Sequence, residues 1–355
     1  VHLFFSPNDE EVRRPATSPL GRALVDRQLS YWEGRGARSE ELSSLRRSNP
    51  EWDFMGRTFT VLALTNLALR EPESRQRYLS VTDRILEESL AREAEHGQEH
   101  FLLPYWQRAP FEAEPARSLF VDGEVALMLG ARLLVEDRAD YRDLHRERVE
   151  RVAQQMEQGP MLSGESYPDE CWTFCNTAAL AALRIADAVQ GEDRSELIHR
   201  WLDNAREHLI DQETGLLVSE YTYRGQHLDG PEGSSIFAVA HFLELVDEAF
   251  ARDQYRRARR LLGVDAAGFS YAREWPDPDR EMADIDSGPI IPGVGASAGS
   301  SGMAILGASA FHDEAFLRGL LASLDFAAFP IREGRGLRYG ASNQVGDAVI
   351  LYACL

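Results

Sequence analysis

The sequence has 355 residues and a formal net charge of −20, from 58 acidic and 38 basic side chains. None of the basic residues is lysine, which excludes Schiff-base chemistry and a phosphate-loop lysine, and the acidic balance argues against a nucleic-acid-binding surface. The hydrophobic content of 44% supports a large core, and no run approaches the roughly 18 apolar residues of a membrane span. We therefore predict one soluble domain over residues 1–355.

The first two predicted helices set a pattern for the chain. Residues 57–69 are apolar on nearly all sides, which indicates a helix buried inside the fold. Residues 74–93 mix apolar and charged side chains with the period of a surface helix. A polar or acidic turn precedes the buried helix, and this turn, inner helix and outer helix recur along the chain.

Six such units predict an all-α fold, an (α/α)6 toroid built from helical hairpins. The predicted inner helices cover residues 57–69, 123–135, 171–189, 234–246, 298–310 and 345–355. The predicted outer helices cover residues 74–93, 141–158, 194–209, 250–262 and 313–324, with residues 20–47 as the sixth. Residues 215–228 and 329–339 read as small β-hairpins on one rim. The six turns would meet around one shared acidic pocket.

The third turn, residues 165–177, carries the densest set of reactive side chains. Asp169 follows Pro168 at a predicted helix start, where capping of exposed N–H groups is the alternative to substrate binding. Cys171 and Cys175 would share a helix face, and a helix N-terminus lowers the pKa of a thiol. Both cysteines are candidate catalytic residues, with burial as small hydrophobic side chains as the alternative.

Acidic residues mark the other predicted helix starts as well. One carboxylate there is ordinary capping, but carboxylates gathered at one end of a toroid raise one another's pKa and can supply a general acid and a general base. We predict Asp53 and Asp122 as the catalytic proton carriers, with aromatic side chains stacking on a sugar or shielding an allylic cation. The predicted substrate-binding residues are Trp52, Glu124, Tyr167, Asp169, Trp172, Tyr221, His227, Glu232, Asp286 and Asn343.

Other chemistries find less support in the sequence. Gly293-Val294-Gly295 lacks the strand and βαβ unit of a dinucleotide loop, and residues 230–235 are not a nucleophile elbow. His241 lies inside an apolar helix and is predicted to belong to the core. The histidines are scattered without the paired spacing of a zinc site, so we predict no metal and no cofactor.

Two stretches resemble the linalool dehydratase-isomerase family. They are residues 49–59, Asn-Pro-Glu-Trp-Asp-Phe-Met-Gly-Arg-Thr-Phe, and residues 167–171, Tyr-Pro-Asp-Glu-Cys. The resemblance implies an (α/α)6 barrel that needs no cofactor and adds or removes water at an allylic tertiary alcohol with an Asp, a His and cysteines. By position, Asp53 would match the early acid, Cys171 the first cysteine and, more loosely, Cys175 the second.

The second predicted inner helix departs from that family pattern, because it carries Asp122 and Glu124 where the family has a histidine. We predict a cofactor-independent lyase or isomerase, of hydratase or dehydratase type, that acts on a small hydroxylated or terpenoid substrate. A glycosidase or sugar epimerase on the same fold and a binding toroid without catalysis are the alternatives. Homo-oligomerisation stays open, as does the compartment, cytoplasmic or periplasmic, because an export signal ahead of Val1 would leave no trace.

Overall fold

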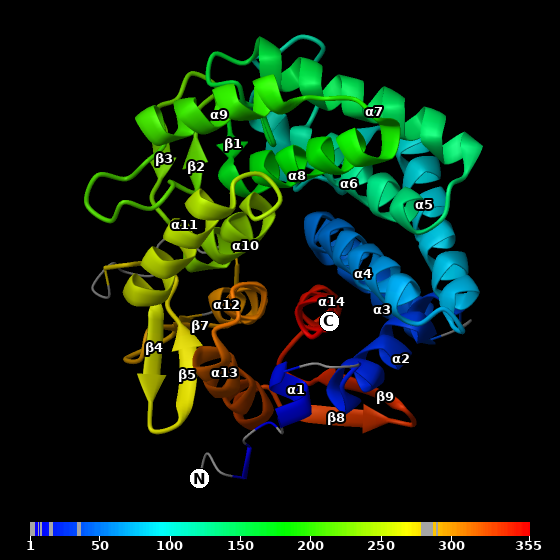
Figure 1. The fold of residues 1–355 in the computed structure, drawn as a ribbon, viewed down its shortest axis with the longest axis vertical. Helices are drawn as coiled ribbons and strands as arrows, with labels where there is room; N and C mark the ends of the chain where they lie inside the picture. Colours follow the sequence, from blue (N-terminus) through cyan, green and yellow to red (C-terminus); the bar gives the residue numbers. More distant parts are fainter. Residues whose placement is uncertain are drawn as a thin grey trace.

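A computed structural model describes residues 4–5, 7, 9–13, 17–33, 37–277, 287–288 and 290–355. Its centre is a closed ring of inner helices (Figure 1). The inner helices are α4 (Pro50–Arg70), α6 (Leu119–Val135), α8 (Thr173–Gln190), α10 (Gly233–Leu243), α12 (Ala298–Ala310) and α14 (Gln344–Ala353). Each packs against the next in chain order, and α14 packs against α4. The predicted (α/α)6 toroid is therefore confirmed.

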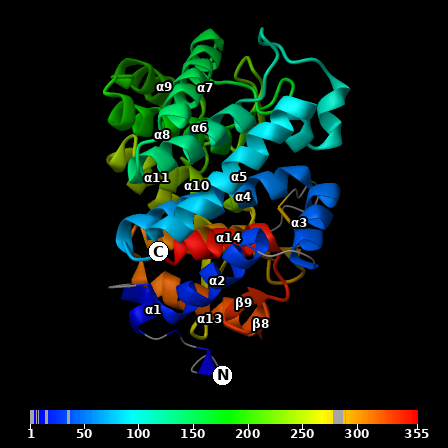
Figure 2. The same cartoon turned by 90° about the vertical axis from the view of Figure 1, so that its right-hand side faces the viewer.

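The outer helices surround this ring (Figure 1). They are α5 (Arg75–His96), α7 (Ala139–Gln158), α9 (Ser195–His208), α11 (Glu248–Leu261), α13 (Glu314–Ala327) and α2 (Pro19–Glu33). Figure 2 shows α14 between α2 and α4, so the N-terminal part of the chain covers the C-terminal helix as predicted. The remaining helices of the described residues are α1 (Asp9–Arg13), α3 (Ala37–Ser48), η2 (Gln98–Phe101) and η3 (Pro104–Arg108). The range 20–47, predicted as the sixth outer helix, therefore contains two helices, α2 and α3.

Small residues let the inner helices pack closely. In α6, a Cβ atom added at Gly123 would lie 3.3 Å from the Cβ atom of Ala179 in α8. In α12, a Cβ atom at Gly307 would lie 3.1 Å from the ring of Phe237 in α10. The apolar, small-residue character of these segments therefore follows from burial on several sides. No helix among the described residues is long and apolar enough to cross a membrane.

Every strand of the described chain lies in a connection from an outer helix to the next inner helix. The predicted hairpins at 215–228 and 329–339 are confirmed. The antiparallel groups are β1 (Cys171–Trp172) with β2 (Glu220–Tyr221) and β3 (His227–Asp229), β4 (Gly263–Ala266) with β5 (Phe269–Ala272), β6 (Ile290–Ile291) with β7 (Ala296–Ser297), and β8 (Pro330–Glu333) with β9 (Gly336–Tyr339).

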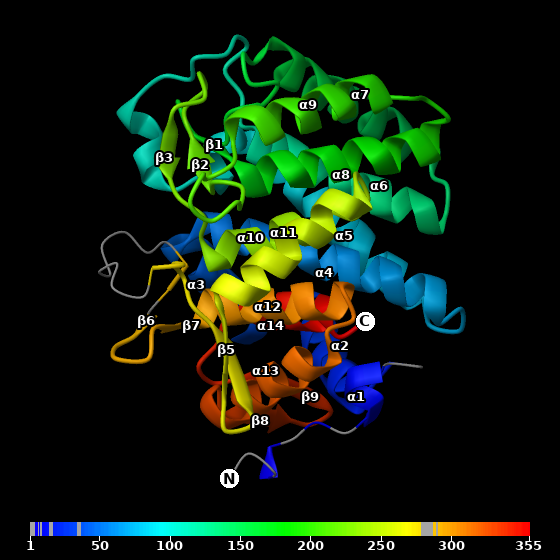
Figure 3. The same cartoon turned by 60° about the vertical axis from the view of Figure 1, so that its left-hand side comes forward.

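These connections lie at the rim where the inner helices begin, because each outer helix returns the chain to that rim. Figure 3 shows β1, β2, β3, β6 and β7 on this side of the molecule. The prediction that a helix starts at Cys171 was wrong by two residues. Cys171 and Trp172 pair with Tyr221 and Glu220 in the sheet, and the helix begins at Thr173.

Candidate functional site

A cavity of about 390 Å³ lies at the N-terminal ends of the inner helices. Every inner helix contributes at least one residue from its first turns, so the six predicted turns do share one pocket. Most of the wall is apolar or aromatic, which is typical of a small-molecule site. The residues on this part of the wall are Trp52, Met55, Tyr105, Phe120, Tyr167, Trp172, Phe174, Ala298, Met303, Ala341, Val345 and Val349.

Among the described residues, Glu51 and Glu232 are the carboxylates that line the cavity. Glu51 is in the first turn of α4, and Glu232 is the residue before α10. Because α4 and α10 are the first and fourth members of a ring of six, these carboxylates enter from opposite sides. Over the described residues, the wall is therefore mostly apolar, with two opposed acids in place of the expected six acidic turns.

A hydrogen-bonded pair sets the orientation of Glu51. The hydroxyl of Tyr167 donates to Oε2 of Glu51 at 2.5 Å and accepts from the backbone N–H of Leu103 at 3.0 Å. The ring of Tyr105 stacks on that of Tyr167 with 4.4 Å between centroids. Burial and the nearby Glu51 charge hold the pKa of Tyr167 far above its usual value. Tyr167 therefore stays protonated and donates a hydrogen bond to the Glu51 carboxylate.

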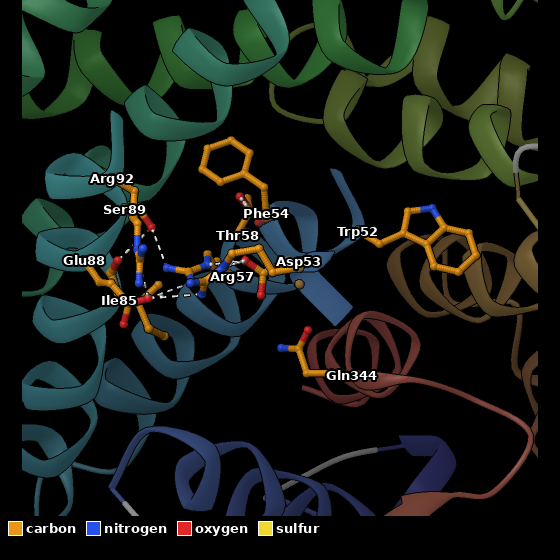
Figure 4. Close-up of polar contacts among 12 residues, drawn as sticks. Trp52, Asp53, Phe54, Arg57, Thr58, Ile85, Glu88, Ser89, Arg92 and Gln344 are labelled. Atoms are coloured by element: carbon orange, nitrogen blue, oxygen red, sulfur yellow. Dashed lines mark hydrogen bonds and ion pairs between the residues drawn. The ribbon is translucent and has the colours of Figure 1, made fainter. Parts of the chain in front are cut away.

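Asp53, predicted as a proton carrier, is not among the residues that line the cavity. Its Oδ2 accepts from Arg46 and from Arg57, each at 3.0 Å, and its side chain is 1% exposed. Figure 4 shows Asp53 and Arg57 turned toward Glu88 of α5, whereas Trp52 extends away from them. Helical geometry explains the separation, because adjacent residues project in different directions.

Asp122, the second predicted proton carrier, also lies outside the cavity wall and is fully buried. Arg117 donates to it at 2.7 and 2.8 Å, Arg148 forms a shorter ion pair, and Gln98 and Gln155 donate at 2.9 and 2.7 Å. Although burial opposes ionisation, hydrogen bonds and charge from the two arginines lower the pKa of Asp122. This carboxylate is held ionised, as a structural acceptor.

Glu124 lies one helical turn beyond Phe120 on the same face of α6, behind the cavity wall. It is 2% exposed and accepts a hydrogen bond from Thr58 at 2.5 Å. Burial, together with the charge of nearby Glu51, raises the pKa of Glu124 to about 8. The side chain is therefore neutral at pH 7.

The two predicted catalytic cysteines occupy different environments. Cys175 lines the cavity, whereas Cys171 is fully buried in β1 and is not among the lining residues. The expectation that a helix N-terminus lowers their pKa was wrong. Burial raises the pKa of both thiols, and for Cys175 the charges of Glu124 and Glu51 add to this effect. Both cysteines are therefore protonated thiols at neutral pH.

Some of the predicted substrate-binding residues line the cavity, and others lie away from it. Those that line the cavity are Trp52, Tyr167, Trp172, Glu232 and Asn343. Asp286 lies outside the described residues.

The predicted binding residues away from the cavity have structural partners instead. Tyr221 is fully buried and donates to Ser163 at 2.7 Å. Asp169, with a φ of 57°, accepts from the backbone N–H of Tyr223 at 3.0 Å. His227 is exposed, and its Nε2 lies 2.7 Å from the carbonyl oxygen of His208.

The sequence-based interpretation did not select Glu51 as a site residue. The helical period distinguishes Glu51 from Asp53, because it places the two residues on different faces of α4. Glu51 and Met55 are four residues apart and share the cavity face, whereas Asp53 and Arg57 share the face toward α5. Ser234 was not selected either, because no local pattern shows that a serine after a predicted loop faces a cavity. Across the described residues, no group of three His, Cys, Asp or Glu side chains is arranged to hold a metal ion.

The solved structures that share this architecture include a mannanase and an isomerase, and the fold places this chain in the class of (α/α)6 toroids. A possible member of the GH105 family from Klebsiella pneumoniae has a TM-score of 0.56 at 15% identity, over 98% of this chain and 93% of that one. An α-1,6-mannanase, GH76A, from Salegentibacter sp. has a TM-score of 0.53 at 11% identity, over 84% and 88%. A D-mannose isomerase has a TM-score of 0.52 at 12% identity, over 85% of each chain.

Those identities establish the shared fold alone. A model of the linalool dehydratase/isomerase family matches residues 126–345 of the sequence. The chain therefore belongs to the linalool dehydratase/isomerase family, as the resemblance predicted. A comparison with curated proteins found no match.

Proposed function

We propose that this protein is a lyase or isomerase that moves water and a proton on a small, largely apolar alcohol. The observation that carries the proposal is the pair of opposed carboxylates, Glu51 and Glu232, in a cavity whose wall is mostly apolar or aromatic over the described residues. Membership of the linalool dehydratase/isomerase family supports the same reaction class. An apolar wall favours a terpenoid-like skeleton, and a carboxyl pair supplies the acid and the base that dehydration needs.

In this proposal Glu232 donates a proton to the substrate hydroxyl, the C–O bond breaks and water leaves. Glu51, held by Tyr167, takes a proton from the carbon beside the resulting cation, and the electron pair of that C–H bond forms the new double bond. The aromatic faces of Trp52 and Trp172 stabilise the positive charge. Return of water to the other end of an allylic cation isomerises the alcohol instead.

The test compares Glu51→Gln and Glu232→Gln with Asp53→Asn. We expect both cavity variants to lose about 10²-fold or more in kcat for dehydration of an allylic tertiary alcohol, because each removes a proton carrier. The prediction from sequence assigns that role to Asp53, so loss in Asp53→Asn alone, with folding intact by circular dichroism, would instead favour Asp53 and contradict our proposal.

Cys175 is the thiol that lines the cavity, and we propose that it contributes a protonated S–H group close to Glu51. Cys175→Ala should lower turnover more than Cys171→Ala, the substitution at the thiol outside the cavity wall. A catalytic role for Cys171, the other candidate from the sequence, predicts the reverse order. Turnover measured on both folded variants decides between them.

A sugar isomerase or epimerase is the second candidate, favoured by polar residues on one part of the cavity wall. These residues are Ser234, Ser235, Ser287, Ser342 and Asn343. Such an enzyme would use the same two carboxylates for proton transfer between adjacent carbons. Release of a deuterium label from carbon in an aldose or ketose, with no release from an allylic alcohol, would select this candidate.

A further inference from the structure

A buried carboxylate that the proposed reaction does not use lies behind the polar part of the cavity wall. Glu274 is 2% exposed and comes just after β5. Its Oε2 accepts hydrogen bonds from the hydroxyls of Ser287, Ser297 and Ser300 at 2.9, 2.6 and 2.7 Å. Its Oε1 accepts a short bond from the hydroxyl of Ser234 and a 3.3 Å bond from the N–H of the same residue.

These bonds connect the starts of two neighbouring inner helices. Ser234 is in the first turn of α10, and Ser297 is the N-cap of α12. The carbonyl oxygen of Glu274 also accepts from the N–H of Gly233 at 2.7 Å. Two of the serines bonded to the carboxylate, Ser234 and Ser287, line the cavity. Glu274 therefore controls how these two hydroxyl groups face a bound molecule.

The direction of each bond is set by proton count. An ionised carboxylate can only accept hydrogen bonds, whereas a serine hydroxyl has one proton and two acceptor lone pairs. Ser234 and Ser287 each use their single O–H group to donate a hydrogen bond to Glu274. Each hydroxyl therefore presents only a lone pair to the cavity. It can accept a hydrogen bond from a bound molecule but cannot donate one.

We propose that Glu274 is a positioning residue that makes this part of the wall an acceptor face, selective for a substrate with a hydroxyl donor over an ether of the same skeleton. The inference rests on the proposed function, because it names the chemical feature by which that cavity would select an alcohol. Glu274 acts through Ser234 and Ser287, whose hydroxyl oxygens would accept a hydrogen bond from the hydroxyl group of the substrate.

The adjacent Ser235 supplies a matched contrast. It also lines the cavity and is 5% exposed, but its Oγ has no hydrogen-bond partner among the described residues. With no carboxylate to hold its proton, the Ser235 hydroxyl can donate or accept. It can therefore bind the oxygen of an alcohol and of an ether equally, and its loss should not change selectivity.

The experiment measures binding rather than turnover. Linalool, an allylic tertiary alcohol, and its O-methyl ether are titrated into the full chain, with quenching of intrinsic fluorescence as the signal because Trp52 and Trp172 line the cavity. We expect the wild-type protein to bind the alcohol about tenfold more tightly than the ether, and Ser234→Ala to lose most of that ratio. Ser235→Ala should keep it.

Glu274→Gln tests the carboxylate at nearly constant shape. Its amide N–H group cannot accept the serine protons, so at least one hydroxyl must turn its proton toward the cavity, and the alcohol-to-ether ratio should fall toward one. Rescue of the ratio in Glu274→Asp would support a role of charge rather than shape. If Glu274→Gln does not fold, the alcohol-to-ether binding ratio of Ser234→Ala tests the inference by itself.

The outcomes separate this inference from the proposed reaction. Equal binding of alcohol and ether by the wild type, a preserved ratio in Ser234→Ala, or no binding of either ligand would overturn the inference. Selective binding without dehydration or isomerisation of the alcohol would overturn the proposed function and leave the acceptor face supported. Turnover of the alcohol without tighter binding of the alcohol than of the ether would support the proposed function and overturn the acceptor face.

Discussion

At the scale of single residues, the protein separates its acids by environment. Asp122 is held ionised by two arginines, whereas Glu124, two positions along the same helix, has a pKa of about 8 because it is buried with one hydroxyl partner. The same side-chain chemistry therefore serves as a fixed charge in one place and as a neutral group in the other. The difference depends on which neighbours the fold brings to each face of α6.

We predict that Glu124→Gln flattens the dependence of stability on pH. In the unfolded chain a Glu titrates near pH 4.3, so between about pH 4.3 and 8 the folded state holds a proton that the unfolded state has lost. The free energy of unfolding of the wild type therefore falls as pH rises through this window, by at most about 1.4 kcal/mol per pH unit from this group.

Urea unfolding at pH 5, 6, 7 and 8 measures the effect. Asp347, whose pKa burial raises to about 7, contributes a slope of the same sign to both proteins, so the difference between them isolates Glu124. Glu157→Gln, on an exposed part of α7, is the control and should follow the wild type. Identical slopes in wild type and Glu124→Gln would contradict the assignment.

At the scale of elements, the start of each inner helix both ends a connection and forms cavity wall. Asn49 caps α4 by accepting from the N–H of Trp52 at 2.9 Å, and the next turn carries Glu51 and Trp52 into the cavity. Asn343 caps α14 in the same way, through the N–H of Gly346 at 2.9 Å, and itself lines the cavity. Helix capping and ligand binding are thus combined at these positions.

We predict that Asn49→Ala weakens both stability and function, whereas Asp247→Ala weakens stability alone. Both residues are N-caps, and loss of such a cap costs about 1 kcal/mol. Asp247 caps the outer helix α11, through the N–H of Phe250 at 2.9 Å. Only Asn49→Ala should raise KM or lower kcat, since only its helix start carries Glu51. Parallel losses of activity in both variants at equal stability would refute this distinction.

At the scale of the whole molecule, the ring makes packing errors costly, because each inner helix contacts two neighbours and cannot shift away from both. The contact between α6 and α8 is a clear case, since a Cβ atom at Gly123 would lie only 3.3 Å from the Cβ atom of Ala179. A displaced helix would also move the cavity residues at its own start.

We predict that Gly123→Val lowers the free energy of unfolding by about 1–3 kcal/mol through overpacking. Gly302→Ala, within α12, is the control, because a Cβ atom there meets nothing within 4 Å. Ala in place of Gly inside a helix should stabilise by about 0.5–1 kcal/mol. Denaturant midpoints report both changes, and an unchanged midpoint in Gly123→Val would show that the ring tolerates expansion.

The sequence by itself determined the architecture, because apolar and amphipathic periodicity is a local property that burial imposes on every inner and outer helix. It also located the shared pocket at the helix starts. It did not decide which acids enter that pocket. Glu51 and Asp53 are two residues apart, and only the rotation of α4 against its neighbours places one in the cavity and the other against Arg57.

The tertiary structure alone decided the protonation and the hydrogen-bond direction of the site residues. Cys175 is a neutral thiol because distant segments bury it beside Glu51 and Glu124, against the expectation from its helix position. Glu274 meets Ser234, forty positions earlier in the chain, because the ring brings α10 and the end of β5 together. Desolvation and charge pairing depend on neighbours from other elements, so no local pattern in the sequence contains them.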